Sequence, residues 1–160
     1  MITGKLLENR VVIEDKKSID KLRNKAYGTL EDNKLYLGLI EALYLIEKEK
    51  LELSEGMDIL EAARKEREFD IKFLVYKDLR ERGLIVKTGF KYGTHFRVYR
   101  GSLEEHAEYL VHVMDEKDKF KGYDLIRTAR MANTVNKKMI LAFVDMENDI
   151  TYIELKRVKL

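Results

Sequence analysis

The 160-residue sequence predicts an α/β (α+β) protein, with a small N-terminal α/β domain and a C-terminal α/β domain built on a mixed central sheet. Three observations support this fold class. Short apolar runs and helix-spaced amphipathic stretches follow one another along the chain. The apolar run at 139–144 is typical of a strand buried on both faces. The almost purely charged stretch EAARKEREFD lies near residue 67, so we expect domains at 1–67 and 68–160.

The first elements are a hairpin and a helix. Residues 2–14 contain two apolar runs on either side of Glu8 and Asn9, which favours a hairpin. Residues 17–27 predict a short helix with Ser18 as its N-cap, and Gly28 ends it.

The rest of the N-terminal half is the segment KLYLGLIEALYLIEKEKLEL and a short helix. The segment opens as a strand and continues as an amphipathic helix, because the apolar residues from Leu39 to Ile46 recur at helical spacing. Residues 51–53 predict a short strand, and Ser54 is expected to cap a helix over 57–64. We find no chemistry-bearing arrangement in this half.

The C-terminal half predicts a sheet with helices packed on it. Gly83 ends the first helix, and Gly89 and Gly93 bracket a turn. The expected order is helix, three strands, helix and two strands, at 69–82, 84–87, 95–100, 109–114, 123–135, 139–144 and 150–158.

The strand at 95–100 places a tyrosine on its polar face. A period of two puts Phe96 and Val98 on one face and His95, Arg97 and Tyr99 on the other. Tyr99 is therefore expected beside cations rather than in the core row.

Charge and composition narrow the classes of function. The net charge is +2, but residues 1–67 hold 13 Lys+Arg against 14 Asp+Glu, and residues 68–160 hold 18 against 15. The segment 87–100 has four cations and no acid, which suits a phosphate-bearing partner and equally a solvated strand face. The absence of cysteine excludes disulfides and thiolate metal sites. No signal-like or membrane-length apolar run is present, so we expect a cytoplasmic protein without membrane contact.

Three side chains could together cleave RNA through its own 2′-hydroxyl. A histidine such as His106 can donate a proton near neutral pH, and a lysine such as Lys137 is a compact cation for the nonbridging oxygens. A tyrosine such as Tyr99 can act as a base only where cations lower a pKa that starts at about 10. Taken singly, a strand tyrosine, a turn histidine and a strand-edge lysine are more often structural or solvated than catalytic.

A resemblance to a known family favours the catalytic alternative. The blocks that carry it are GFKYGTHFRVYRG, EEHAEYLVHV, TARMANTVNKKMILAFVD and ITYIELKRV, and they resemble the C-terminal half of archaeal tRNA-splicing (tRNA-intron) endonucleases over residues 69–158. The stretch LGLIEALYLIEKEKLEL is similar to the N-terminal domain of that family. The resemblance implies a restriction-endonuclease-like catalytic nuclease domain at 68–160. It also implies cleavage of precursor tRNA at a bulge-helix-bulge, with no metal or cofactor and with 2′,3′-cyclic phosphate and 5′-hydroxyl ends.

The resemblance also implies roles for individual residues. Tyr99 would be the general base, His106 the general acid and Lys137 the electrostatic stabiliser, whereas His95 and His112 match no role. The residues expected to bind RNA are Arg130, which matches a base-clamping arginine of the family, and Arg157, Lys138 and Arg97.

The segment DMEND resembles an acidic loop through which subunits of the family dock, and it contains Asp145, Glu147 and Asp149. A homotetramer, arranged as a dimer of dimers, is therefore expected, with a heterotetramer as the alternative. Two other functions stay open: a metal-dependent nuclease on a related fold, and a non-catalytic nucleic-acid-binding or structural subunit.

Overall fold

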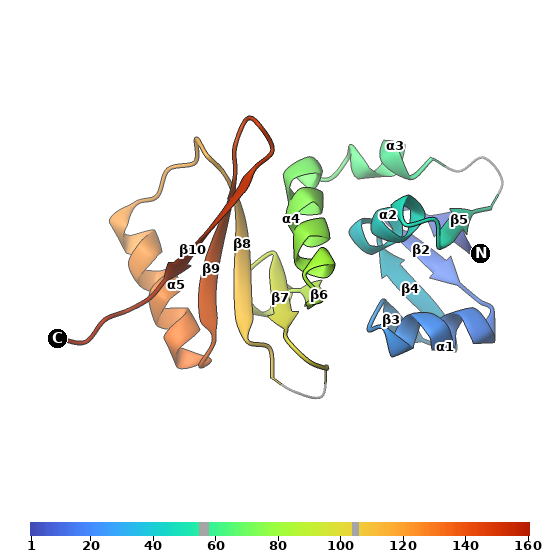
Figure 1. Cartoon of the computed structure of the whole chain (residues 1–160), viewed down its shortest axis with the longest axis horizontal. Coiled ribbons are helices and arrows are strands. Elements are labelled where there is room, and N and C mark those ends of the chain that lie inside the picture. The colour runs from blue at the N-terminus through green and yellow to red at the C-terminus, as the bar shows by residue number, and fades with distance from the viewer. Residues whose placement is uncertain (55–57, 104–105) are drawn as a thin grey trace. The chain divides into compact units, whose positions relative to one another are not determined.

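The computed structural model describes residues 1–54, 58–103 and 106–160 (Figure 1). The chain divides into two compact units, Met1–Phe69 and Asp70–Leu160. The division lies two residues beyond the boundary expected near residue 67. Each unit contains a sheet with helices, so the predicted α/β fold class is confirmed.

The N-terminal unit is built on a five-stranded sheet of order β3-β4-β2-β1-β5. The predicted hairpin is confirmed, with Glu8 in the left-handed region at its turn, and the sheet core contains the fully buried Val11, Ile13, Leu35 and Leu37. The elements are β1 (Ile2–Leu7), β2 (Arg10–Ile13), α1 (Lys16–Asn24), β3 (Thr29–Glu31), β4 (Lys34–Gly38), α2 (Leu39–Glu47), β5 (Leu51–Leu53) and α3 (Ile59–Ala63).

Both predicted helix caps in this unit are wrong. The Asp15 carboxylate accepts hydrogen bonds from the Ser18 N–H at 3.0 Å and the Ser18 hydroxyl at 2.8 Å, so Asp15 caps α1 and Ser18 lies within it. Asp58 caps α3 by accepting from the Leu60 N–H at 2.9 Å. A carboxylate is as good a cap as a hydroxyl, and in each case it is the acid that directly precedes the helix. The predicted start of α3 at Met57 lies outside the described residues.

The C-terminal unit has the predicted order of elements. They are α4 (Phe69–Glu81), β6 (Ile85–Thr88), the 3₁₀ turn η1 (Phe90–Tyr92), β7 (Phe96–Tyr99), β8 (Tyr109–Asp115), α5 (Gly122–Thr134), β9 (Lys138–Val144) and β10 (Ile150–Leu155). The sheet order is β10-β9-β8-β7-β6, with β8 and β9 parallel and the other pairs antiparallel, so the predicted mixed sheet is confirmed. The last strand ends three residues before 158, because Leu155 pairs with Met139 near the start of β9 and no partner extends further.

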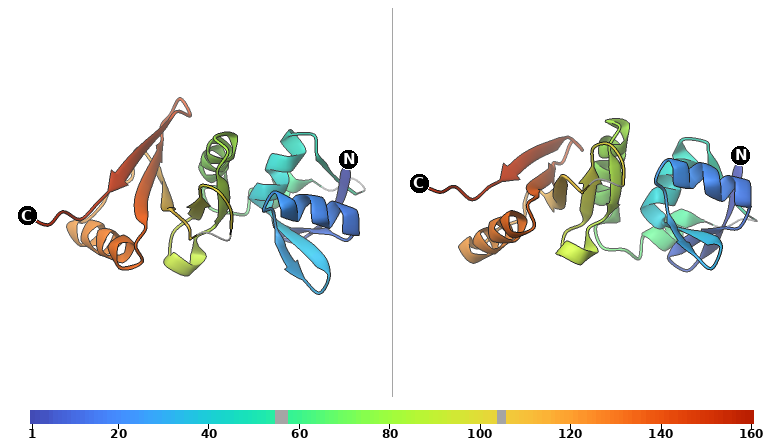
Figure 2. Two further views of the ribbon diagram at one scale, coloured as in Figure 1. Left: turned by 60° about the horizontal axis from the view of Figure 1, so that its bottom comes forward. Right: turned by 90° about the horizontal axis from the view of Figure 1, so that it is seen from below.

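Helices α4 and α5 cover opposite faces of this sheet (Figures 1 and 2). On the α5 face, Leu110 and Met139 pack with Ala132 of α5. On the α4 face, the Phe96 ring lies 5.9 Å from the Tyr76 ring of α4. The Tyr152 hydroxyl of β10 donates to Asp78 of α4 at 2.6 Å, which ties the far edge of the sheet to the same helix.

Candidate active site

Three strand ends meet at one end of the C-terminal sheet. Because β7 is antiparallel to β8 and β8 is parallel to β9, the last residue of β7 lies beside the first residues of β8 and β9. The Glu108 N–H donates to the Val98 carbonyl at 2.9 Å, and the Lys138 N–H donates to the Glu108 carbonyl at 3.0 Å. This end of the sheet, from Tyr99 across to Lys137, is called the cleavage edge below. The name refers to the ends of β7, β8 and β9, not to an edge strand, and to the function proposed for them.

Register and contacts place Tyr99 and Lys137 on the same face of the sheet. Arg97 pairs with Leu110, and Leu110 pairs with Met139, so these three side chains share the α5 face. Tyr99 lies two residues after Arg97 in β7 and therefore projects to that face too. The Lys137 ammonium lies 5.7 Å from the ring of Tyr92, which packs on the same face. Two strand spacings separate the backbones of Tyr99 and Lys137 by about 10 Å.

Tyr99 is buried, which corrects the expectation of a polar, open face. The alternation along β7 is as predicted, but Tyr99 is only 7% exposed. The reason is that the α5 face is a packed face, as the burial of Leu110 and Met139 shows. The predicted cationic neighbour is present, since the Arg97 guanidinium carbon lies 5.8 Å from the Tyr99 ring centroid. The Arg97 Nε is buried and has no hydrogen-bond partner among the described residues.

Lys137 and the segment that carries His106 are joined directly. The Lys137 ammonium donates to the Ala107 carbonyl at 3.0 Å, across thirty residues of chain. Asn136, in the left-handed region, ends α5, and the Lys137 N–H returns to the Ala132 carbonyl, so the backbone at Lys137 is fixed. His106 is exposed, and its imidazole is therefore open to a ligand.

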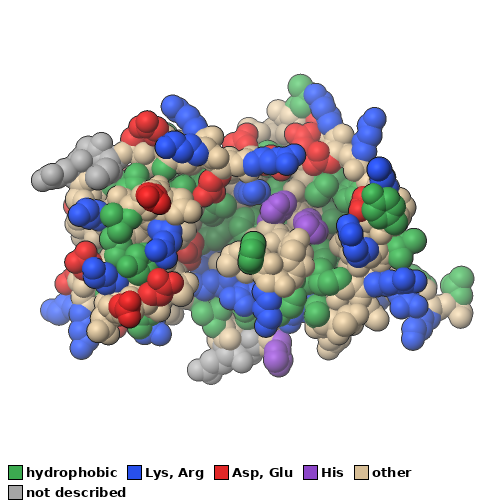
Figure 3. Space-filling view, turned by 180° about the vertical axis from the view of Figure 1, so that it is seen from behind, with side chains coloured by type: hydrophobic (Ala, Val, Ile, Leu, Met, Phe, Trp, Pro, Cys, Tyr) green, Lys and Arg blue, Asp and Glu red, His purple; other side chains and the backbone are tan. Residues whose placement is uncertain are grey.

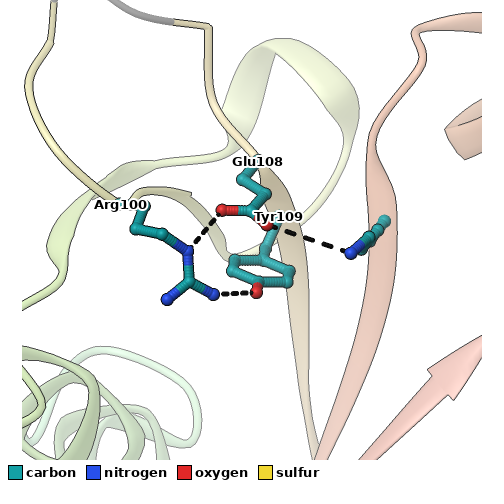
Figure 4. Close-up of polar contacts among 4 residues, drawn as sticks. Arg100, Glu108 and Tyr109 are labelled. Atoms are coloured by element: carbon teal, nitrogen blue, oxygen red, sulfur yellow. Dashed lines mark hydrogen bonds and ion pairs between the residues drawn. The ribbon is translucent and has the colours of Figure 1, made fainter.

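A second set of polar groups surrounds Glu108 (Figure 4). The Arg100 guanidinium donates from Nε to the Glu108 carboxylate at 2.8 Å and from Nη2 to the Tyr109 hydroxyl. The Lys138 ammonium lies 3.9 Å from the other carboxylate oxygen of Glu108. The hydrogen bond from Arg100 holds the pKa of Glu108 below its usual range, and the same bond raises the pKa of Arg100. Glu108 thus stays ionised between two cations.

The two adjacent lysines therefore have different surroundings. Among the described residues, the Lys137 ammonium donates one hydrogen bond, to the neutral Ala107 carbonyl, which leaves two of its hydrogens for another acceptor. Lys138 already faces a carboxylate. Sequence reasoning missed Glu108, because its position between Arg100 and Lys138 emerges only once the register of three strands is known.

A pocket of about 280 Å³ lies between the end of α5 and β10, and its lining includes Lys137, Lys138 and Arg157. Arg157 is therefore brought close to two other predicted site residues. Arg130 is exposed on α5 and does not line this pocket.

The predicted acidic loop is a tight turn. The Asp145 carboxylate accepts from the Glu147 and Asp149 N–H groups, both at 2.9 Å, and Asn148 is in the left-handed region. The Asp145 carboxylate is thus used within the turn, and Glu147 and Asp149 are exposed.

The other two histidines form a separate pair. The ring centroids of His95 and His112 lie 5.5 Å apart, with the rings edge to face. Figure 3 shows two histidine side chains close together and one apart. The His95 Nδ1 accepts from the Val113 N–H at 2.8 Å. Burial, with Lys72 and His112 adding to it, lowers the pKa of His95 to about 4, and burial also lowers the pKa of His112.

Across the described ranges, no three His, Asp or Glu side chains lie close enough together to hold a metal ion. The expectation of a metal-free reaction stays a prediction. Within the same ranges, no helix has the length and apolar character needed to cross a membrane.

The C-terminal unit carries cations, a phenol and an imidazole near one end of its mixed sheet. These are side chains with which a nuclease can act on a phosphodiester. Two family models match the chain: the catalytic C-terminal domain of tRNA intron endonuclease over residues 69–152, and the N-terminal domain of the same enzyme over residues 2–64. The chain belongs to the tRNA intron endonuclease family, and it is an endoribonuclease.

Curated relatives match along nearly the whole chain. A tRNA-splicing endonuclease of Thermococcus kodakarensis is 44% identical over 167 residues, covering 99% of both chains. Proteins with the same description from Thermococcus onnurineus and Methanothermobacter thermautotrophicus are each 42% identical, covering 99% and 94% of this chain and 97% and 94% of their own.

Proposed function

We propose that this chain cleaves precursor tRNA at intron–exon junctions within a bulge-helix-bulge, without a metal, leaving 2′,3′-cyclic phosphate and 5′-hydroxyl ends. The observation that carries the proposal is the bond from the Lys137 ammonium to the Ala107 carbonyl. It joins the start of β9 to the segment of His106, beside the end of β7 where Tyr99 lies. Membership of the tRNA intron endonuclease family supports RNA as the substrate.

The reaction needs three roles, and the cleavage edge offers one group for each. The Tyr99 phenolate takes the proton of the 2′-hydroxyl and becomes a neutral phenol, and the 2′-oxygen then attacks the adjacent phosphorus. The bond from phosphorus to the 5′-oxygen breaks, and the His106 imidazolium gives its proton to the leaving oxygen. The Lys137 ammonium stabilises the charge that develops on the nonbridging oxygens. Because protein groups fill all three roles, the proposed reaction does not require a metal.

The binding of RNA is assigned to Arg130, Arg157, Lys138 and Arg97. Support for Arg157 and Lys138 comes from their shared pocket with Lys137. Arg130 is exposed on α5, where its planar guanidinium is free to stack on an unpaired base.

We propose a cytoplasmic homotetramer, arranged as a dimer of dimers, in which the turn with Asp145, Glu147 and Asp149 contacts a basic surface of another subunit. The exposed side chains of Glu147 and Asp149 support this assignment. A solution mass of about four times 18.9 kDa is expected for the purified chain alone. A smaller mass would favour the heterotetramer with a second kind of subunit.

A cleavage assay with EDTA tests the reaction. A bulge-containing precursor tRNA should be cut at the same rate with and without EDTA, and the products should carry cyclic phosphate and 5′-hydroxyl ends. A single 2′-deoxy substitution at the cleaved position should block cutting there, since no nucleophile remains. Loss of cutting in EDTA would favour a metal-dependent nuclease, and binding without cutting would favour a non-catalytic subunit.

A further inference from the structure

Phe90 is the most exposed aromatic side chain in the part of the chain that the structure describes. It opens η1 and is 88% exposed. Burying a phenylalanine side chain stabilises a folded protein, and at Phe90 the fold does without this stabilisation.

The turn that carries Phe90 is rigidly built. The Gly89 N–H donates to the His95 carbonyl at 3.1 Å, and the Thr94 hydroxyl donates to the Phe96 carbonyl at 3.1 Å. A Cβ on Gly89 would lie 2.1 Å from the Thr94 hydroxyl and 2.9 Å from the Phe96 backbone, so only glycine fits. An aromatic ring held on such a turn gives up little conformational entropy when it binds a ligand.

Tyr92 connects this turn to the cleavage edge. It lies two residues after Phe90, and its ring packs against the cluster of Leu110, Ala132 and Met139. The Lys137 ammonium lies 5.7 Å from the centroid of the Tyr92 ring. Phe90 is therefore presented on the same short turn as a side chain that contacts the proposed stabilising cation.

The charge around the turn suits a polyanion. Lys91 lies within the turn, and its ammonium, like the ammonium of Lys137, lies 5.7 Å from the centroid of the Tyr92 ring. A flat apolar ring among cations matches a chain of phosphates with exposed bases better than it matches an apolar protein surface. Aromatic side chains bind such bases by stacking, whatever the identity of the base.

We propose that Phe90 is a stacking platform for an unpaired base of the RNA, close to the scissile phosphate. This inference rests on the proposed function, because it takes its ligand to be the RNA that is cut at the cleavage edge. The platform fixes the path of the RNA across the turn and takes no part in proton transfer.

The chain has no tryptophan, so Phe90→Trp introduces a single indole at the proposed platform. The probe is a bulge-containing precursor tRNA with 2′-deoxy residues at both cleavage positions. Adding it should quench the indole fluorescence of Phe90→Trp in a saturable way, because a stacked base lies against the ring. The matched control is Phe120→Trp, whose position is 37% exposed and lies on the α5 face beside Phe143; its fluorescence should change little.

Affinity for the same RNA separates stacking from packing. Phe90→Ala and Phe90→Leu should both weaken binding roughly five- to hundredfold, and Phe90→Trp should retain it, since leucine restores apolar bulk but not a flat face. Wild-type affinity in Phe90→Leu, or bound RNA without quenching, would overturn the proposal. So would a changed solution mass of Phe90→Ala, which would make Phe90 a subunit contact. If the RNA quenches the fluorescence of Phe90→Trp and binds the wild-type protein, but the wild-type protein fails to cut all-ribose RNA, the proposed reaction fails and the platform stands.

Discussion

Two regions of the C-terminal unit place a histidine in opposite surroundings, one exposed and one buried. His106 lies exposed beside the cleavage edge, next to the carbonyl that Lys137 binds. His95 lies four residues from Tyr99 along the chain, paired with the ring of His112 and with Nδ1 occupied by a backbone N–H. The comparison shows that burial and hydrogen bonding, and not residue type, decide which imidazole is open to a ligand.

The largest expected effect contrasts these two regions. His106→Ala should lower the rate of cleavage of bulge-containing precursor tRNA by about 10²- to 10⁴-fold, because the leaving oxygen loses its proton donor. Affinity for the uncleavable 2′-deoxy RNA should be retained. His112→Gln serves as the matched control and should cut at nearly the wild-type rate. Equal losses in the two variants would show that the contrast between the regions is false.

A smaller effect is expected from Glu108, which we infer to be a positioning residue. Arg100 and Glu108 flank the segment that carries His106, and their ion pair helps to close it. Glu108→Gln should reduce kcat roughly tenfold with KM nearly unchanged, and Glu108→Asp should restore part of the loss. The thermal unfolding midpoint should stay near that of the wild type, because exposed ion pairs contribute little to stability.

The control for Glu108 is Asp124→Asn. Asp124 and Arg127 form an ion pair at 3.0 Å on α5, with side-chain exposures close to those of Glu108 and Arg100. Asp124→Asn should leave both kcat and KM unchanged. A raised KM with normal kcat in Glu108→Gln would instead assign Glu108 to RNA binding.

The smallest effect concerns stability at acid pH. Because the pKa of His95 is lowered to about 4 in the folded chain, the unfolded chain binds a proton to His95 first as the pH falls below about 6.5. The stabilising contribution of neutral His95 is therefore complete above pH 6.5 and is lost between about 6.5 and 4. Its size should be about 1 kcal/mol, since the ring is partly solvated. Urea unfolding of the wild-type protein and of His95→Gln at a series of pH values measures this contribution. If the free energy of unfolding depended on pH in the same way in both proteins, the prediction would be refuted.

The pattern of apolar residues predicted nearly all of the helices and strands of the C-terminal unit. Its order of elements follows from periodicity and glycine positions, which are local signals, whereas the mixed strand directions of its sheet follow only from the family resemblance. The caps at Asp15 and Asp58 were missed because aspartate and serine are both good N-cap residues, and residue type alone does not decide between them near the start of a helix.

The surroundings of the site residues were harder to predict. The burial of Tyr99 was missed because no local pattern shows that the α5 face of the sheet, where Tyr92 and Ala132 pack with Leu110 and Met139, is a packed face. The same is true of Glu108, whose two cationic partners are Arg100, just after β7, and Lys138, at the start of β9. Side-chain type predicted the chemistry, whereas neighbours contributed by distant segments could not be predicted.

The bond between the Lys137 ammonium and the Ala107 carbonyl has a consequence for synthesis of the protein. The two residues are thirty positions apart, and α5 and the start of β9 must be in place before they meet. A growing or truncated chain that stops before residue 137 has the imidazole and the phenol but not the cation. Under the proposed roles, such a fragment is harmless to cellular RNA, because the ability to cut arises only when the last part of the sheet assembles.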